Sequence, residues 1–241
     1  MSVIADLERD VAGSIRDYIN GRQDALAESL SLVACPSAFP GLIHDITTDT
    51  DRFADVVRRS VVHPNGFAKI VLLSAPEYRL RLHVWREIDT AASEFRESIH
   101  NHRWDFAATI VAGAYRHQEF QVSESGKSFF GYRYQPAEDR RSYRLVPVGT
   151  QSLRCVFDAR LAQGSRYSMS SVVLHKVVPD LAQPPVSLVL EGPHHPTAVD
   201  VFAEHDLELR ASVPFIPLSA KSLRRHLSAI AALPAFSFGP A

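Results

Sequence analysis

The fold of this chain is decided by the stretch Ser98-Ile99-His100-Asn101-His102-Arg103-Trp104-Asp105-Phe106. Side chains alternate between the two faces of a β-strand, so His100 and His102 would point the same way from an extended strand. Two neutral imidazoles can then bind one transition-metal ion side by side. A third histidine, His175, lies in a second strand-like run, and facing strands of a barrel would bring it to the same ion.

A simpler interpretation of the His-x-His pair stays open. Such pairs are common on surfaces and in clefts that hold no metal, and the chain has 11 histidines, so some of them pair by chance. The case for a metal site therefore depends on the pattern of the remaining sequence.

The two ends of the chain read as helical. Apolar residues recur at spacings of three and four along residues 4–19 and 26–33, which predicts two amphipathic helices. A third helix is expected over residues 51–60, capped by Thr48 or Thr50, and a last one after Ser219. We therefore divide the chain into a helical region at 1–66, a β-domain at 67–215, and a C-terminal helix and tail at 216–241.

Between these regions the sequence changes to runs rich in β-branched and aromatic residues, separated by clusters of turn-forming residues. This pattern predicts a mainly β fold, either a sandwich or a barrel. The expected strands are residues 68–73, 78–85, 109–122, 129–134, 143–148, 153–157, 167–178 and 186–190.

The expected strand at 78–85 has one apolar and one polar face. The apolar face carries Leu80, Leu82 and Val84. The polar face carries Arg79, Arg81, His83 and Trp85. The polar face either meets solvent or lines a pocket, where Arg81 and His83 would bind an anion, because a guanidinium grips a carboxylate at two points. By the same parity, Tyr167 and His175 would line one cavity, although a core or rim position for Tyr167 stays open.

Two segments resemble the motifs of the cupin superfamily, in its cysteine dioxygenase-like branch. The first is Leu80–His102, with Leu-Arg-Leu-His-Val-Trp followed by Ser-Ile-His-Asn-His, and Gly113 lies one residue before the place of the glycine that ends this motif. The second is Leu-His-Lys-Val at 174–177, where the family places its third histidine, with a strand-like run at 187–193 after it. The resemblance covers roughly residues 67–205.

The resemblance implies a cupin-type jelly-roll barrel that holds non-haem Fe(II) on His100, His102 and His175. It implies O₂-dependent oxidation of a thiol, an amino-acid derivative or another small polar or anionic substrate. Lys69 would replace the arginine that holds the substrate carboxylate, and Trp85 would match a tryptophan of the pocket.

Two departures from the family pattern bear on the substrate. Ala107 stands where the common cupin motif has a glutamate, as is usual in the three-histidine branch. The Ser-His-Tyr relay of a cysteine dioxygenase would fall on Ser187, Val189 and Glu191, and only the serine is kept. Cysteine itself is therefore a doubtful substrate.

Three neutral imidazoles would leave the charge of a divalent metal uncompensated, which favours an anionic, chelating substrate. We expect the substrate to bind Fe(II) first and O₂ to be activated beside it. Lys69, Arg81 or His83 would neutralise the substrate, and Tyr167 would supply a proton or a hydrogen bond.

Other interpretations of the same pocket stay open. Zinc or nickel there would act as a Lewis acid for isomerisation or hydrolysis, and a pocket without catalysis would only bind a small molecule. It is also open whether Asp105, His117 or Glu119 reaches the metal.

The overall composition limits the kinds of molecule that the protein is expected to bind and the compartment in which it is expected to occur. A formal net charge of −1 gives no basic field for nucleic acid or anionic lipid, and no apolar run is long enough to span a membrane. The N-terminus lacks the pattern of a secretion signal, and two distant cysteines fit a reducing compartment, so a cytoplasmic location is expected. The excess of Arg over Lys suggests that the source is a bacterium with a high GC content. A homodimer is also open, because barrels of this kind often pair through their edge strands.

Overall fold

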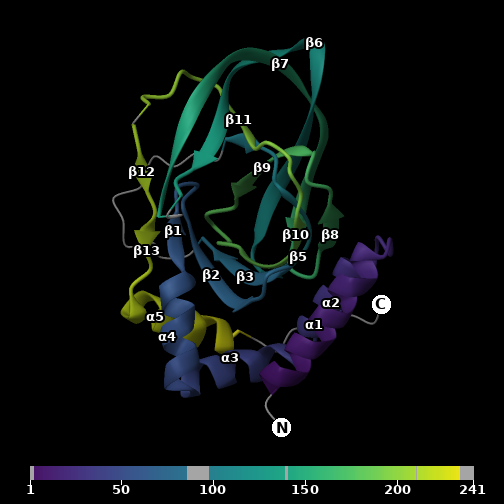
Figure 1. Cartoon of the computed structure of the whole chain (residues 1–241), viewed down its shortest axis with the longest axis vertical. Coiled ribbons are helices and arrows are strands. Elements are labelled where there is room, and N and C mark those ends of the chain that lie inside the picture. Colours follow the sequence, from purple (N-terminus) through teal and green to yellow (C-terminus); the bar gives the residue numbers. More distant parts are fainter. Residues whose placement is uncertain (1–2, 86–97, 139–140, 210, 234–241) are drawn as a thin grey trace.

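The computed structural model describes residues 3–85, 98–138, 141–209 and 211–233. These residues form two antiparallel β-sheets with helices packed outside them, which confirms the prediction of a mainly β fold with N-terminal helices and a C-terminal helix. Figure 1 shows the sheets in the upper part of the molecule and the helices gathered beneath them.

Both sheets are built from strands that lie far apart in the sequence. Sheet A has, in order, β13 (Ile216–Pro217), β1 (Val61–His63), β2 (Phe67–Ser74), β3 (Arg79–Val84), β10 (Val186–His194), β5 (Trp104–Ala112) and β8 (Arg166–Met169). Sheet B has β11 (Asp200–Ala203), β4 (Ile99–His100), β9 (Leu174–Pro179), β6 (Ala114–Pro136), β7 (Ser142–Ala162) and β12 (Val213–Pro214).

The chain wraps as a jelly roll. From β3 to β11, successive strands alternate between sheets A and B, apart from the long hairpin of β6 and β7. Alternation of this kind places the inner faces of the two sheets opposite each other. The first and last parts of the chain extend sheet A, because β1 pairs with both β2 and β13. The domain boundaries at 66 and 215 stay predictions.

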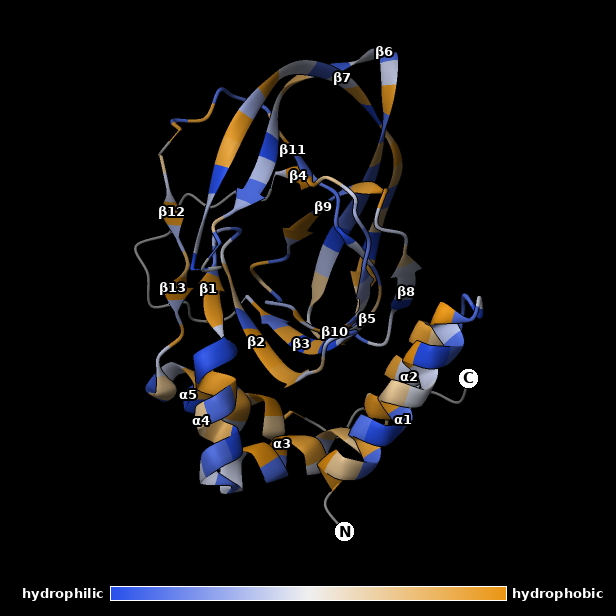
Figure 2. Ribbon diagram, in the orientation of Figure 1, coloured by the Kyte–Doolittle hydropathy of each residue, from blue (hydrophilic) through white to orange (hydrophobic). Residues whose placement is uncertain are grey.

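The main hydrophobic core lies between the helices and the outer face of sheet A. The helices are α1 (Val3–Ile19), α2 (Ala25–Val33), α3 (Phe39–Thr48), α4 (Thr50–Arg59) and α5 (Ala220–Ala231). Their apolar stripes bury residues such as Leu42 and Leu223 against Leu80, Leu82 and Leu188 of the sheet. Figure 2 shows the alternation of hydrophobic and hydrophilic residues around these helices. Full burial of one such side chain contributes about 1.5–3 kcal/mol.

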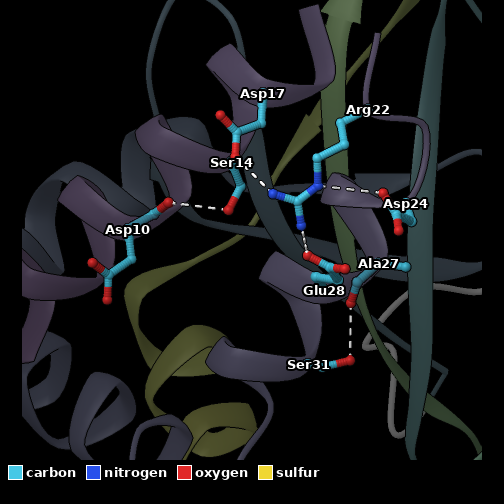
Figure 3. A network of polar contacts seen from close by, with 8 residues as sticks. All are labelled: Asp10, Ser14, Asp17, Arg22, Asp24, Ala27, Glu28 and Ser31. Carbon is cyan, nitrogen blue, oxygen red and sulfur yellow. Dashed lines mark hydrogen bonds and ion pairs between the residues drawn. The ribbon is translucent and has the colours of Figure 1, made fainter. Parts of the chain in front are cut away.

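A set of surface ion pairs surrounds the turn between α1 and α2 (Figure 3). The Arg22 guanidinium lies 2.9 Å from Asp17 and 3.5 Å from Asp24, and it also contacts Glu28. Exposed pairs of this type contribute little to stability because water and salt screen them. The buried stripe of each helix, rather than this network, therefore holds α1 and α2 to the sheet.

The helical part differs from the sequence prediction in two places. Helix α3 was not expected, although Pro40 occupies the first turn, where the missing N–H of a proline has no partner to lose. The cap of α4 is Asp49 rather than Thr48 or Thr50, because the Asp49 carboxylate accepts hydrogen bonds from the backbone N–H groups of Asp51 and Arg52.

Several strand boundaries also differ, and three of them bear on the site or on the course of the chain. The expected strand at 167–178 is divided between β8 in sheet A and β9 in sheet B, with a turn between them closed by the Val173 N–H and the Ser170 carbonyl. The expected strand at 109–122 is broken at Gly113, where φ is +69° and a Cβ would lie 2.3 Å from the Gln183 carbonyl oxygen. In contrast, β6 continues through the predicted turn at 123–126, and these residues bulge from its pairing with β7.

None of the helices that the structure describes combines the length and the apolar character needed to cross a membrane. Cys35 and Cys155 are both free thiols. The end of the predicted C-terminal tail, residues 234–241, lies outside the described residues.

Candidate metal centre

A cavity of about 390 Å³ lies between the two sheets. His100, His102 and His175 line it together with Lys69, Arg81, His83, Trp85 and Tyr167. The structure therefore brings every residue of the predicted site to one cavity, while the roles assigned to these residues stay predictions. Much of the remaining lining is aromatic or aliphatic, including Phe67, Phe106, Tyr115 and Phe215.

The three histidines are brought together by the pairing of two short strands. His100 of β4 lies directly opposite His175 of β9. His102 follows β4, and its backbone N–H donates a 3.0 Å hydrogen bond to the Ser171 carbonyl in the turn before β9. As a result, one ring nitrogen from each histidine lies within 4.8 Å of the other two.

The protonation of these rings suits metal binding. Burial lowers the pKa of His100 and holds the pKa of His102 and His175 well below the ordinary histidine value, so all three imidazoles are neutral at pH 7. The Nδ1 of His100 lies 2.9 Å from the Ser98 carbonyl oxygen, to which it can only donate, so its Nε2 keeps the lone pair. The Nε2 atoms of His102 and His175 lie 2.9 Å apart.

Three neutral nitrogen donors on one side of a cavity fit a divalent transition metal. Among the described residues, no carboxylate or thiolate belongs to this donor group. The charge of a bound ion would therefore stay uncompensated by the protein ligands.

Two cations of sheet A face the cavity in different electrostatic states. The Arg81 guanidinium lies 2.6 Å from the buried Glu191 carboxylate and 5.1 Å from the centre of the Trp104 ring, so its charge is already balanced. Lys69 has no carboxylate partner within the described part of the chain, and burial lowers its pKa to about 8. Of these two cations of sheet A, Lys69 is thus the one whose charge is available to an anionic ligand.

Aromatic and hydroxyl groups surround the remaining space. His83 packs against Phe67 and Trp85, with ring centroids 4.4 and 6.0 Å away, and its Nε2 is buried without a hydrogen-bond partner among the described residues. The hydroxyl groups of Tyr115 and Tyr167 lie 2.9 Å apart. Tyr167 comes from β8 of sheet A rather than from the strand of His175, so both residues face the cavity from opposite sheets and the parity argument for them was wrong.

Asp105, His117 and Glu119 lie outside the group of metal ligands. The Asp105 carboxylate accepts hydrogen bonds from the Tyr18 hydroxyl of α1 and, at 2.6 Å, from the Ser171 N–H. Burial by itself would raise the pKa of Asp105, but these hydrogen bonds outweigh it and lower the pKa. His117 is buried on β6, 3.3 Å from the Glu119 carboxylate.

Sequence reasoning missed two partners within the site. Glu191 was considered only as a position of the relay, whereas its buried side chain pairs with Arg79, Arg81 and His194. Tyr115 had no expected role from the sequence, whereas its hydroxyl lies 2.9 Å from that of Tyr167. The parity of residues 187, 189 and 191 on β10 was the one available signal that Glu191 faces inward.

No family model matches this chain, and a search of the curated proteins found no similar sequence. Among solved structures, it is similar to the hydroquinone 1,2-dioxygenase PnpCD, crystallised with Cd²⁺ and 4-hydroxybenzonitrile. The two are 14% identical over 59% of this chain and 71% of that chain, with a TM-score of 0.33. It is also similar to an uncharacterised double-stranded β-helix protein from Klebsiella pneumoniae. These two are 12% identical over 62% of this chain and 95% of that chain, with a TM-score of 0.33. Similarity this distant carries no argument about function, so the conclusion reached from the chain itself is a jelly roll with a three-histidine group able to hold a divalent metal.

Proposed function

We propose that this protein is a metal-dependent oxygenase that uses Fe(II) on His100, His102 and His175 to oxidise a small anionic substrate with O₂. The observation that carries the proposal is the group of three neutral imidazoles on the wall of the cavity between the two sheets. When bound there, Fe(II) would offer open positions to substrate and O₂ and would supply the redox chemistry.

The charges in the cavity support an anionic substrate. Lys69 would bind a carboxylate or another anionic group, because its ammonium faces the cavity without a carboxylate partner among the described residues. Arg81 would add a hydrogen bond while keeping its ion pair with Glu191. The unpartnered Nε2 of His83 would give or accept one more hydrogen bond at the same anionic group.

Other side chains of the cavity support a substrate with an apolar body and the transfer of a proton. Trp85, Phe67 and Phe215 would pack against the carbon skeleton of the substrate and exclude water. The paired hydroxyls of Tyr115 and Tyr167 would hold a proton or donate a hydrogen bond to a substrate atom in the cavity.

Elemental analysis of the purified full chain tests the metal first. The variants are a His100→Ala/His102→Ala double variant and, as a matched control, His44→Ala, which removes an exposed histidine from α3. We expect near-stoichiometric iron in the parent and the control, and its loss in the double variant. Iron-loaded protein is then given a panel of thiols, amino acids and keto acids, and O₂ uptake is measured.

The possible results separate the alternatives. Bound iron without O₂ uptake on the whole panel would count against an oxygenase. Zinc or nickel in place of iron would favour Lewis-acid isomerisation or hydrolysis. The absence of any metal, even after anaerobic reconstitution with Fe(II), would overturn the proposal and leave a small-molecule-binding protein.

A further inference from the structure

The three histidines differ in what holds their second ring nitrogen. A histidine that binds a metal usually donates its other N–H to a carbonyl or carboxylate, which fixes the ring and makes the ligand more basic. His100 has such a partner in the Ser98 carbonyl. His175 does not, because its Nδ1 is buried without a hydrogen-bond partner among the described residues.

A carboxylate lies on the side of His175 that faces away from the other ligands. Across sheet B, β9 lies between β4 and β6, so His175 has His100 opposite it on one side and Glu119 opposite it on the other. Directly opposed residues of an antiparallel pair share one face, with Cβ atoms about 4.5–5.5 Å apart. Because the His175 Nε2 points toward His102, its Nδ1 lies on the opposite edge of the ring.

The neighbours of Glu119 leave it able to take this hydrogen bond. One carboxylate oxygen of Glu119 contacts the His117 Nε2 at 3.3 Å, which is long for a hydrogen bond, and no partner of its other oxygen is found within the described residues. The His117 ring is buried, and its centroid lies 5.5 Å from that of His175. Glu119 itself is half-buried at the edge of this cluster, so its side chain has room to turn.

We propose that Glu119 is a positioning residue for the metal centre, whose carboxylate accepts the Nδ1–H of His175 when a metal occupies the Nε2 side. His117 holds the Glu119 carboxylate beside β9 through its Nε2. The result is a carboxylate–histidine–metal arrangement built across β6 and β9, with Glu119 never binding the metal itself. This inference rests on the proposed metal site.

The test measures metal affinity and needs no substrate. Co²⁺ is titrated into the metal-free full chain in competition with a chelator, and the visible absorption bands of the bound Co²⁺ are recorded. The variants are Glu119→Ala and Glu119→Gln. The matched control is Asp158→Asn. Asp158 lies on the neighbouring strand β7, and its exposed carboxylate pairs with Arg116 of β6.

We expect Glu119→Ala to bind Co²⁺ about 10–100-fold more weakly than the parent and to shift the absorption bands, because the His175 ring loses its acceptor. Glu119→Gln should lose less affinity, since an amide oxygen still accepts the Nδ1–H. Asp158→Asn should bind Co²⁺ like the parent.

Several outcomes would overturn the inference. Parent-like affinity and bands in Glu119→Ala would show that His175 needs no carboxylate, and the metal site would survive that result. An equal loss in Glu119→Ala and Asp158→Asn would point to a general effect on the sheet. Failure of the parent itself to bind Co²⁺ would overturn the metal site and this inference together.

Discussion

The two faces of sheet A carry opposite chemistry on the same strands. The outer face of β3 and β10 presents Leu80, Leu82 and Leu188, which are fully buried under the helices. The inner face of β2 and β3 presents Lys69, Arg81 and His83 to the cavity. The outer face stabilises the fold by removing apolar surface from water. The inner face holds charged and polar groups in the cavity, and partial removal of such groups from water costs stability.

The largest effect is expected where a buried charge on the inner face loses its partner. Glu191→Ala should lower the free energy of unfolding by about 3–5 kcal/mol, because Arg81 would stay buried without its carboxylate. Urea denaturation of the variant and the parent measures this loss. As a control, Glu204→Ala removes an exposed partner of Lys127 and should change stability by less than about 0.5 kcal/mol. Equal losses in the two variants would mean that the buried Arg81–Glu191 pair stabilises the fold no more than an exposed ion pair does.

On the outer face, Leu82→Ala should lower the free energy of unfolding by about 2–5 kcal/mol, because it leaves a cavity beneath the helices. The same variant should bind Co²⁺ with the parent's affinity at a temperature where it is folded. Weaker Co²⁺ binding by the folded variant would show that the two faces of sheet A are coupled.

Replacing the charge of Lys69 should raise stability. Lys69→Met should increase the free energy of unfolding at pH 7 by about 1–3 kcal/mol, because the parent buries an ammonium that the unfolded chain exposes to water. The pKa of Lys69 in the parent falls from 10.5 to about 8 on folding. The difference in stability between variant and parent should therefore be full below pH 8 and should disappear as the pH rises from about 8 to 10.5. Thermal unfolding at pH 7 and pH 10 measures both effects, and a less stable variant at pH 7 would contradict the description of Lys69 as a buried, unpaired cation.

The smallest expected effect is the pH dependence of anion binding. Above about pH 8 the Lys69 ammonium loses its proton, so affinity for a carboxylate should fall by up to about tenfold per pH unit. Benzoate, as a probe, can be titrated by the fluorescence of Trp85 and Trp104, because both of the chain's tryptophans line the cavity. Lys69→Met should remove the pH dependence, whereas Lys127→Met, which alters an exposed lysine, should keep it. If Lys69→Met kept the pH dependence of benzoate binding, a titratable group other than Lys69 would be its cause.

Much of the site could be predicted because the argument for it was local. Alternation along a strand follows from the backbone, so the separation of Leu80, Leu82 and Val84 from Arg81 and His83 needed no knowledge of neighbouring strands. The same reasoning failed for Tyr167 and His175, because a turn between them sends the two residues to different sheets. Helix α3 escaped prediction because its first turn contains Pro40 and its third residue is Gly41, both of which usually mark breaks.

The sequence by itself determined the class of fold, the helical ends, and which three histidines are the candidate metal ligands. Only the tertiary structure decided which charges are balanced and which are free. Glu191 lies 112 residues beyond Arg79 in the sequence and contacts it because β10 pairs with β3. Likewise, Glu119 adjoins His175 because β6 pairs with β9. The periodicity of a strand is a property of its own residues, whereas the choice of its neighbours depends on how the whole jelly roll closes, and that choice sets the electrostatics of the cavity.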